Sequence, residues 1–290
     1  MHQVKVRQVV SQRTPLNFSR YSKEKVTEMN DKYPGNKTLM IVFTQTGPKN
    51  IETSHVHYDK IKKVLGEDEG GKADIDYIEL KETFNDNEHV FVEKVPMPSK
   101  TEIESYFKTK IGKVANEYDK FMFVFLTYKG DKDGLIHVAD TPNYYIKEVF
   151  DILKTPDLIH IRGKPKLFLI QADDIYLIPG MKEFHNKGYI ETKIIPSDTD
   201  RLVITSNIPQ RFDDESKPSL LIQAFCEVMK KWRKSDDSLN ELMVNSLNEL
   251  MVNITDIVKT HIEQMENVSG AGKLDLPLVH SSLTRFWKID

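Results

Sequence analysis

The sequence contains a single cysteine, Cys226, among 290 residues. One thiol excludes an internal disulfide framework and a cysteine-based zinc site, which is typical of a protein in a reducing compartment. No run of about 18 apolar residues is present, and the opening MHQVKVRQVV lacks the apolar core of a signal peptide. We therefore expect a cytoplasmic protein without membrane-spanning segments.

An excess of charge of either sign is also lacking. The 41 basic and 44 acidic residues give a formal net charge of -3 and are mixed along the chain. This balance does not favour nucleic acid or an anionic membrane as a partner. With 39% hydrophobic residues, the chain is long enough to bury the core of one large domain.

The apolar stretches of the chain have the lengths of buried strands. The stretch 164–174, KPKLFLIQADD, holds the run LFLI between a turn signal and two aspartates. Further strands are predicted at 38–44, 90–94, 120–128, 135–138, 201–206 and 278–287. A fully apolar strand is typical of the centre of a parallel sheet, whose carboxyl ends present functional groups to a crevice.

Amphipathic stretches between these strands predict helices. They lie at 74–84, 99–115, 142–154 and 219–234, and one long helix is predicted over the repeated octapeptide SLNELMVN (238–245 and 246–253) to about residue 264. A capping box of Ser99 and Glu102 begins the second helix. In the first helix, Ile75 and Ile78 are expected to face the sheet. The alternation of strands and helices predicts an α/β fold with a mostly parallel, doubly wound sheet.

Several segments carry a family resemblance. They are DIDYIELKETF (74–84), FVFLTYKG (123–130), GKPKLFLIQA (163–172), RLVITSNIP (201–209), LIQAFCEVM (221–229) and PLVHSSLTRFW (277–287). In this order and spacing they resemble the protease domain of the caspases, the cysteine-dependent, aspartate-specific proteases, over residues 38–290. The resemblance implies a three-layer sandwich in which a mostly parallel sheet of about six strands is flanked by about five helices.

The resemblance also implies the organisation of the chain. Residues 1–37 form a short N-terminal arm, and 38–290 form the caspase-like domain. Within that domain, 38–174 corresponds to the large subunit, 175–195 to the linker and 196–290 to the small subunit. Active caspases are cut after aspartate in this linker, and 175–195 contains no aspartate. We therefore expect an uncut single chain.

Both positions of the caspase catalytic dyad are changed. The caspase nucleophile stands in a Q-A-C signature, and here Gln171-Ala172 is followed by Asp173. The segment that carries the family histidine matches Thr127-Tyr128-Lys129, so its position is Tyr128. A phenol with an ordinary pKa of about 10 is a poor base near neutral pH, and a carboxylate is a poor nucleophile toward an amide. The chain is expected not to be an enzyme.

The substrate pocket is also incomplete. Caspases hold the substrate aspartate with two arginines and the glutamine of the signature, because a guanidinium fork matches a carboxylate. Gln171 remains. The first arginine position falls near Gly70, in the acidic segment GEDEGG, and Arg211 is the nearest candidate for the second. No cofactor and no metal are expected, because adjacent residues such as Asp173 and Asp174 point to opposite sides of a strand.

The last predicted strand is the candidate interface. In the family this strand pairs with the same strand of a partner, and an edge strand is a ready template for pairing. Its residues are Leu278, Val279, His280, Ser281, Ser282, Leu283 and Thr284. The expected partner is an active caspase of the same organism or a second copy of the chain.

These observations lead to one functional hypothesis and two alternatives. The hypothesis is a catalytically inactive caspase homologue that regulates an active caspase, and so apoptosis, by heterodimerisation. The sequence does not show whether the effect is activation or inhibition. The alternatives are an enzyme with a relocated nucleophile and a caspase-fold scaffold that only pairs with itself.

Overall fold

The computed structural model describes residues 35–45, 72–130, 134–174, 200–208, 217–234, 252, 254–260 and 277–282. All of them belong to one compact unit, Lys32–Asp290. The domain limits predicted within 1–37 and 175–195 therefore fall largely outside the described residues and stay predictions. None of the described helices is long and apolar enough to cross a membrane.

A six-stranded sheet runs in the order β2-β1-β3-β6-β7-β8. Its strands are β1 (Thr38–Thr44), β2 (Val90–Pro96), β3 (Lys120–Tyr128), β6 (Lys166–Asp173), β7 (Arg201–Ser206) and β8 (Leu278–Ser281). Every pairing is parallel except the last, between β7 and β8. The stretch 164–174 contains β6, which lies at the centre of the sheet, as its continuous apolar run predicted.

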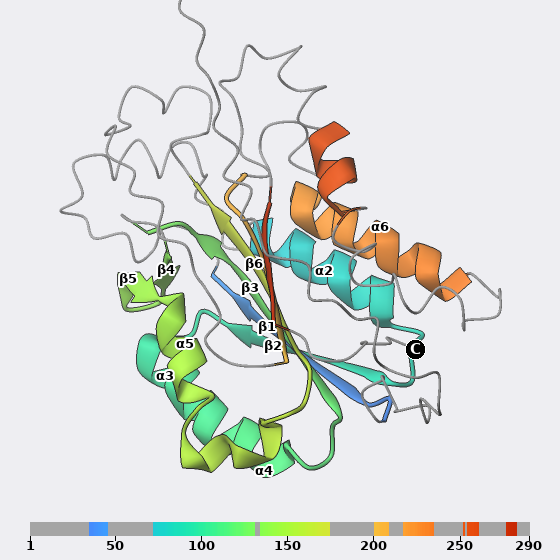
Figure 1. Cartoon of the computed structure of the whole chain (residues 1–290). Coiled ribbons are helices and arrows are strands. Elements are labelled where there is room, and N and C mark those ends of the chain that lie inside the picture. Colours follow the sequence, from blue (N-terminus) through green and yellow to red (C-terminus); the bar gives the residue numbers. More distant parts are fainter. Residues whose placement is uncertain are drawn as a thin grey trace, which may run out of the picture. The chain divides into compact units, whose positions relative to one another are not determined.

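Helices cover both faces of this sheet. They are α2 (Lys72–Phe84), α3 (Lys100–Ser105), η1 (Tyr106–Ile111), α4 (Gly112–Val114), α5 (Ile146–Ile152), η2 (Pro156–Ile161) and α6 (Leu220–Lys234). Figure 1 shows α2 and α6 on one face and α3 and α5 on the other. The three-layer α/β sandwich and the mostly parallel sheet are thus confirmed.

Each face of the sheet has its own hydrophobic core. On the side of α2 and α6, Met122, Leu169 and Ile204 pack against Phe225. On the side of α3 and α5, aromatic residues dominate: the Phe168 ring lies 5.0 Å from Phe123 and 4.9 Å from Phe150, centroid to centroid. Alternate residues of a strand point to opposite faces, so one continuous apolar strand supplies both cores.

The helix predicted at 99–115 begins as expected. Ser99 Oγ accepts a hydrogen bond from the Glu102 amide, and the Glu102 carboxylate accepts one from the Ser99 amide. These two bonds satisfy amides that a helix N-terminus otherwise leaves without partners. Beyond α3 the helix widens into the π-helical turn η1 before α4.

Two local predictions were wrong. The segment predicted to begin a helix at 142 instead forms β5 (Thr141–Tyr145), which pairs with β4 (Leu135–Val138), because a hairpin buries the Tyr144 ring. In α2, Ile78 is 51% exposed, whereas Leu80 and Phe84 are buried. The buried stripe of α2 runs through these two residues, one helical turn apart, and Ile78 lies outside it.

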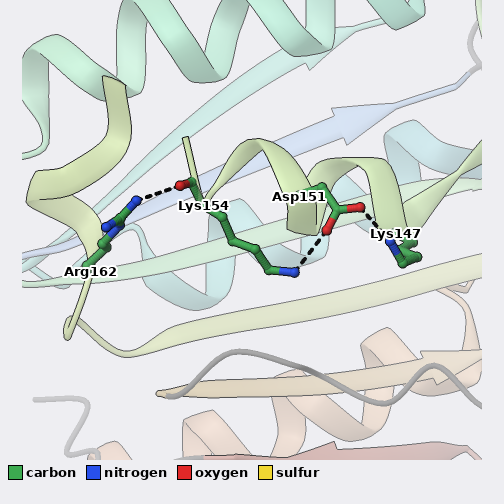
Figure 2. A network of polar contacts seen from close by, with 4 residues as sticks. All are labelled: Lys147, Asp151, Lys154 and Arg162. Atoms are coloured by element: carbon green, nitrogen blue, oxygen red, sulfur yellow. Dashed lines mark hydrogen bonds and ion pairs between the residues drawn. The ribbon is translucent and has the colours of Figure 1, made fainter. Parts of the chain in front are cut away.

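A polar network ties the end of α5 to the segment that leads into β6. The Asp151 carboxylate accepts hydrogen bonds from Lys147 Nζ at 2.6 Å and Lys154 Nζ at 2.9 Å, as Figure 2 shows. Arg162 donates to the Lys154 carbonyl. The bonds from Lys147 and then Lys154 lower the pKa of Asp151. Because these side chains are largely exposed, the pairs orient the segment more than they stabilise it.

Candidate functional site

Tyr128 and Asp173 are partners in the register of the central strands β3 and β6. Each is the last residue of its strand, so both lie at the carboxyl edge of the sheet, and both are buried. The Lys129 amide donates to the Asp173 carbonyl at 3.0 Å and extends the ladder one residue further. The two positions that the resemblance assigns to the catalytic dyad are thus brought side by side.

Gln171 bonds inward, to neighbouring groups of its own chain. Its Nε2 donates to Asp173 Oδ1 at 2.6 Å and to the Ile208 carbonyl at 2.8 Å. The side chain is 2% exposed. Gln171 and Asp173 are two residues apart on β6 and so point to the same face of the sheet, which allows the direct bond. The side-chain amide that the resemblance assigns to the substrate pocket donates a hydrogen bond to a carboxylate of the protein itself.

Lys129 and Asp174 form an ion pair beside this bond. Lys129 Nζ lies 3.3 Å from Asp174 Oδ2, and the two side chains are 11% and 6% exposed. The Asp174 amide also donates to the Asn207 carbonyl at 2.9 Å. These contacts connect the ends of β3 and β6 with the segment after β7. Such a shielded ion pair is screened less by salt than one at the surface.

An imidazole stands next to the tyrosine. The ring centroids of Tyr128 and His137 are 6.0 Å apart at an interplanar angle of 71°, an edge-to-face contact. Thr127 Oγ1 donates to the His137 carbonyl at 2.6 Å and holds β4 against the end of β3. His137 therefore contacts a phenol, and the ring pair is a packing contact at the side of the crevice.

The single thiol lies away from this edge of the sheet. Cys226 is on α6, 1% exposed, within the core that α6 shares with α2. Burial raises the pKa of Cys226 to about 12, against the opposing effect of a hydrogen bond with Thr83. Because the thiolate is the reactive form, a thiol in this environment is inert near neutral pH.

The remaining predicted site residues divide into two groups. Leu278 to Ser281 form β8, and Ser282 continues its backbone pairing by donating to the Arg201 carbonyl at 2.7 Å. Gly70, Arg211, Leu283 and Thr284 lie outside the described residues, so their roles stay predictions. Within the described ranges, no group of three or more histidine, cysteine, aspartate or glutamate residues is arranged to hold a metal ion.

Sequence reasoning missed the role of Lys129. A signal was present, because a lysine directly follows Tyr128 and an aspartate directly follows Asp173. Since β3 and β6 end together in register, residues one step beyond the two dyad positions lie close enough to form an ion pair. The carbonyl of Ile208 could not be found this way, because backbone acceptors carry no sequence signal.

Two solved structures resemble this chain. With pro-sf-caspase-1 the sequence identity is 17% and the TM-score 0.63, covering 89% of this chain and 97% of that one. With caspase-1 from Spodoptera frugiperda the identity is 16% and the TM-score 0.61, covering 89% of this chain and 93% of that one. At such identities the likeness establishes the fold, which is the caspase sandwich. No curated protein sequence matches the chain significantly.

The family follows from the sequence match. A family model described as the caspase domain (Peptidase_C14) matches residues 55–285, well over half of the chain. The chain belongs to the caspase family. Its mostly parallel six-stranded sheet agrees with that assignment.

Proposed function

We propose that this caspase homologue is catalytically inactive and regulates an active caspase, and so apoptosis, by protein–protein interaction. The observation that carries the proposal is the state of Asp173, which stands at the nucleophile position and accepts a hydrogen bond from Gln171 at 2.6 Å. The ion pair of Lys129 with Asp174 lies one residue further along the chain from Tyr128 and Asp173. Gln171 Nε2, Asp173 and the Lys129–Asp174 pair therefore all bond to groups of the chain itself.

Peptide cleavage in this family requires a thiolate and an imidazole that moves the proton. Asp173 supplies no sulfur nucleophile, and a carboxylate that attacked an amide would be expelled again more readily than the amine leaves; Tyr128 offers a phenol in place of an imidazole. Loss of such a pair typically lowers the rate by about three to six orders of magnitude. Cys226 offers no substitute, because it is buried among apolar side chains of α6 and α2.

Incubation with a fluorogenic peptide library and an active-site-directed probe tests the catalytic half of the proposal. The expected result is neither turnover nor labelling. Reproducible turnover that Asp173→Ala abolishes would show that the residue at position 173 takes part in catalysis and would overturn the proposal. Turnover that survives Asp173→Ala and co-elutes with the chain would reveal a nucleophile elsewhere in it and would also overturn the proposal, whereas turnover that separates from the chain on further purification would come from a contaminating protease.

The binding half of the proposal rests on β8, which ends the described sheet order. An edge strand exposes backbone donors and acceptors to which another strand can pair. Co-purification with an active caspase from the same organism is expected, and Ser282→Asp should abolish it because a charge at the strand is desolvated on pairing. Ser105→Asp, at an exposed serine on α3, is the matched control.

The activity of the partner caspase is measured in the same co-purified samples, because strand pairing by itself does not show whether the chain activates or inhibits that caspase. A raised or lowered rate of peptide cleavage by the partner supports the regulatory role and shows its direction. Undisturbed co-purification of Ser282→Asp would exclude the strand as the interface. Binding without a change in the rate of the caspase would contradict a regulatory role and would favour the alternative in which the chain is only a scaffold.

A further inference from the structure

The side chain of Gln171 has one polar atom without a partner. Both hydrogens of its Nε2 are used, because Nε2 donates to Asp173 Oδ1 at 2.6 Å and to the Ile208 carbonyl at 2.8 Å. These two acceptors fix the orientation of the amide, since an oxygen in the place of Nε2 would face two other oxygens. Gln171 Oε1 is buried and has no hydrogen-bond partner in the described part of the chain. The group that this side chain still offers is therefore an acceptor.

A second such atom lies in the same row of the sheet. Thr44, Leu126 and Gln171 are register partners across β1, β3 and β6. Side chains at register partners point to the same face, and Leu126 belongs to the core on the side of α2 and α6. Thr44 and Gln171 therefore point to that side as well. Thr44 Oγ1 is buried and, like Gln171 Oε1, has no hydrogen-bond partner among the described residues.

A buried carboxylate accompanies these two oxygens. Asp173 is two residues beyond Gln171 on β6 and points to the same face. Gln171 Oε1 is bonded to the same carbon as Nε2, so it lies next to the Asp173 carboxylate. Lys129 and Asp174 come one residue later on their strands and point to the opposite face. The positive charge of Lys129 is thus directed away from Asp173.

A further carboxylate lies on the side of α2 and α6, the two helices that cover this face in Figure 1. Asp76 of α2 is buried and accepts a hydrogen bond from the Ser219 amide at 2.6 Å. The positive end of the α6 dipole is therefore already met by an anion of the chain. What this side of the edge has in excess is buried oxygen acceptors and negative charge. A ligand that fits it brings hydrogen-bond donors and positive charge.

The acceptors suit a primary ammonium group better than a guanidinium. Arginine binds a carboxylate best through two parallel hydrogen bonds, one to each oxygen. Asp173 Oδ1 already accepts a hydrogen bond from Gln171, which obstructs that arrangement. The ammonium of lysine is compact, and its three donors can be shared among separate acceptors such as Gln171 Oε1, the Asp173 carboxylate and Thr44 Oγ1.

We propose that the carboxyl edge of the sheet, on the side of α2 and α6, binds a lysine side chain of a partner protein through Gln171 Oε1, Asp173 and Thr44 Oγ1. Its charge preference is opposite to that of the caspase pocket, which holds an aspartate with arginines. The inference rests on the proposed function, because a site that does not cleave a bound segment can retain it. It goes further in naming the side chain that the partner presents and a contact surface separate from β8.

Peptide titrations of the unmodified chain test the proposal. The probes are acetylated and amidated pentapeptides in which glycines flank a central lysine, arginine or aspartate, and a pentaglycine amide with an unblocked N-terminus. NMR follows the side-chain amide of Gln171. The lysine peptide should shift this signal and bind about tenfold or more tightly than each of the other three, the effect of one hydrogen bond between charged groups.

Two results of these titrations would overturn the proposal. One is a lysine peptide that leaves the Gln171 signal in place, as expected if a water molecule meets these oxygens. The other is an arginine or aspartate peptide, or the pentaglycine amine, that binds as tightly as the lysine peptide. Equal binding of the pentaglycine amine would assign the site to the end of a chain and not to a lysine side chain.

Variants of nearly unchanged shape test which oxygens bind the ammonium. Asp173→Asn keeps an oxygen for Gln171 Nε2 and removes the charge, and Thr44→Val removes the hydroxyl. The dissociation constant of the lysine peptide should rise about tenfold in the first and about threefold in the second. Gln45→Met is the matched control, because Gln45 Oε1 is also buried without a partner among the described residues but belongs to the residue after Thr44, which points to the other face. An equal loss of binding in Gln45→Met would contradict the proposed acceptors.

The same samples separate this inference from the proposed function. Co-purification of an active caspase with a chain that does not bind the lysine peptide would overturn the inference alone and leave the proposed function standing. Mass spectrometry of the lysine peptide after the titration should find it intact. Cleavage of the bound peptide by the chain would support the preference for lysine and overturn the proposal that the chain is catalytically inactive.

Discussion

Lys129 and Asp174 form an ion pair of 3.3 Å between the ends of β3 and β6, with both side chains almost fully buried. Each directly follows a position that the resemblance assigns to the caspase dyad, Tyr128 or Asp173. The caspase signature carries arginine, glutamine or glycine after the nucleophile. Asp174 therefore places a negative charge where the signature has either a positive charge or a neutral residue. A lysine of opposite sign meets it across the crevice. The edge of the sheet that serves catalysis in the family is joined by a contact within the chain.

Breaking this ion pair from one side should be costly. Lys129→Met leaves a buried carboxylate and Asp174→Asn a buried ammonium, and each single change should lower the free energy of unfolding by about 3 kcal/mol. The double variant Lys129→Met with Asp174→Leu should recover most of that loss, because apolar side chains need no charge partner. Urea unfolding measures all three variants.

The control for that measurement is the exposed pair of Lys147 and Asp151 (Figure 2). Asp151→Asn should cost less than about 1 kcal/mol, as exposed ion pairs do. A loss at Asp174 no larger than the loss at Asp151 would contradict the view that burial makes the Lys129–Asp174 pair structurally important.

Restoring the dyad should not restore the protease. Asp173→Cys combined with Tyr128→His returns the two reacting groups to adjacent positions of β3 and β6. Because the first pocket arginine is replaced near Gly70 by an acidic segment, and Lys129 and Asp174 are still paired beyond the ends of β3 and β6, aspartate-containing fluorogenic peptides should not be cleaved. The double variant with Asp173→Ala in place of Asp173→Cys is the control. Cleavage of aspartate peptides above that control would show that the pocket is intact.

Cys226 should report on unfolding. Burial raises its pKa to about 12, so the folded protein keeps the thiol protonated at pH 8 and should not react with iodoacetamide. The unfolded chain ionises near pH 8.5, which means that stability from this group is complete below that pH and declines as pH rises toward 12. Labelling followed by mass spectrometry through a urea titration should coincide with the loss of helical signal. Rapid labelling without urea would disprove the burial.

One carboxylate joins α2 to the residue that precedes α6. Asp76 of α2 accepts a hydrogen bond from the Ser219 amide at 2.6 Å, directly before α6 begins. Asp76→Ala should cost about 1–2 kcal/mol, as for the loss of a helix cap. Asp256→Ala, at an exposed aspartate in the helical residues 254–260, should cost almost nothing. Thermal unfolding distinguishes the two, and equal effects would argue against capping by Asp76.

Local sequence signals were sufficient to predict a structural element where a single kind of interaction determines its conformation. The apolar runs of β1, β3 and β6 predicted buried strands because every residue of a central parallel strand is covered. The capping box at Ser99 could be predicted from the sequence because it is made by residues three positions apart. The hairpin of β4 and β5 could not be predicted, because burial of Tyr144 depends on residues that only folding brings together. The exposed Ile78 was misassigned for the same reason.

The sequence by itself determined which chemistry is absent: no thiol at position 173, no imidazole at position 128, and one cysteine elsewhere in the chain. Those statements need only residue identities. The tertiary structure alone decided what the replacements do, because Gln171 meets Asp173 and Ile208, and Lys129 meets Asp174, only when the ends of three parallel strands are assembled at one edge. The same assembly leaves β8 as the last strand of the described sheet order.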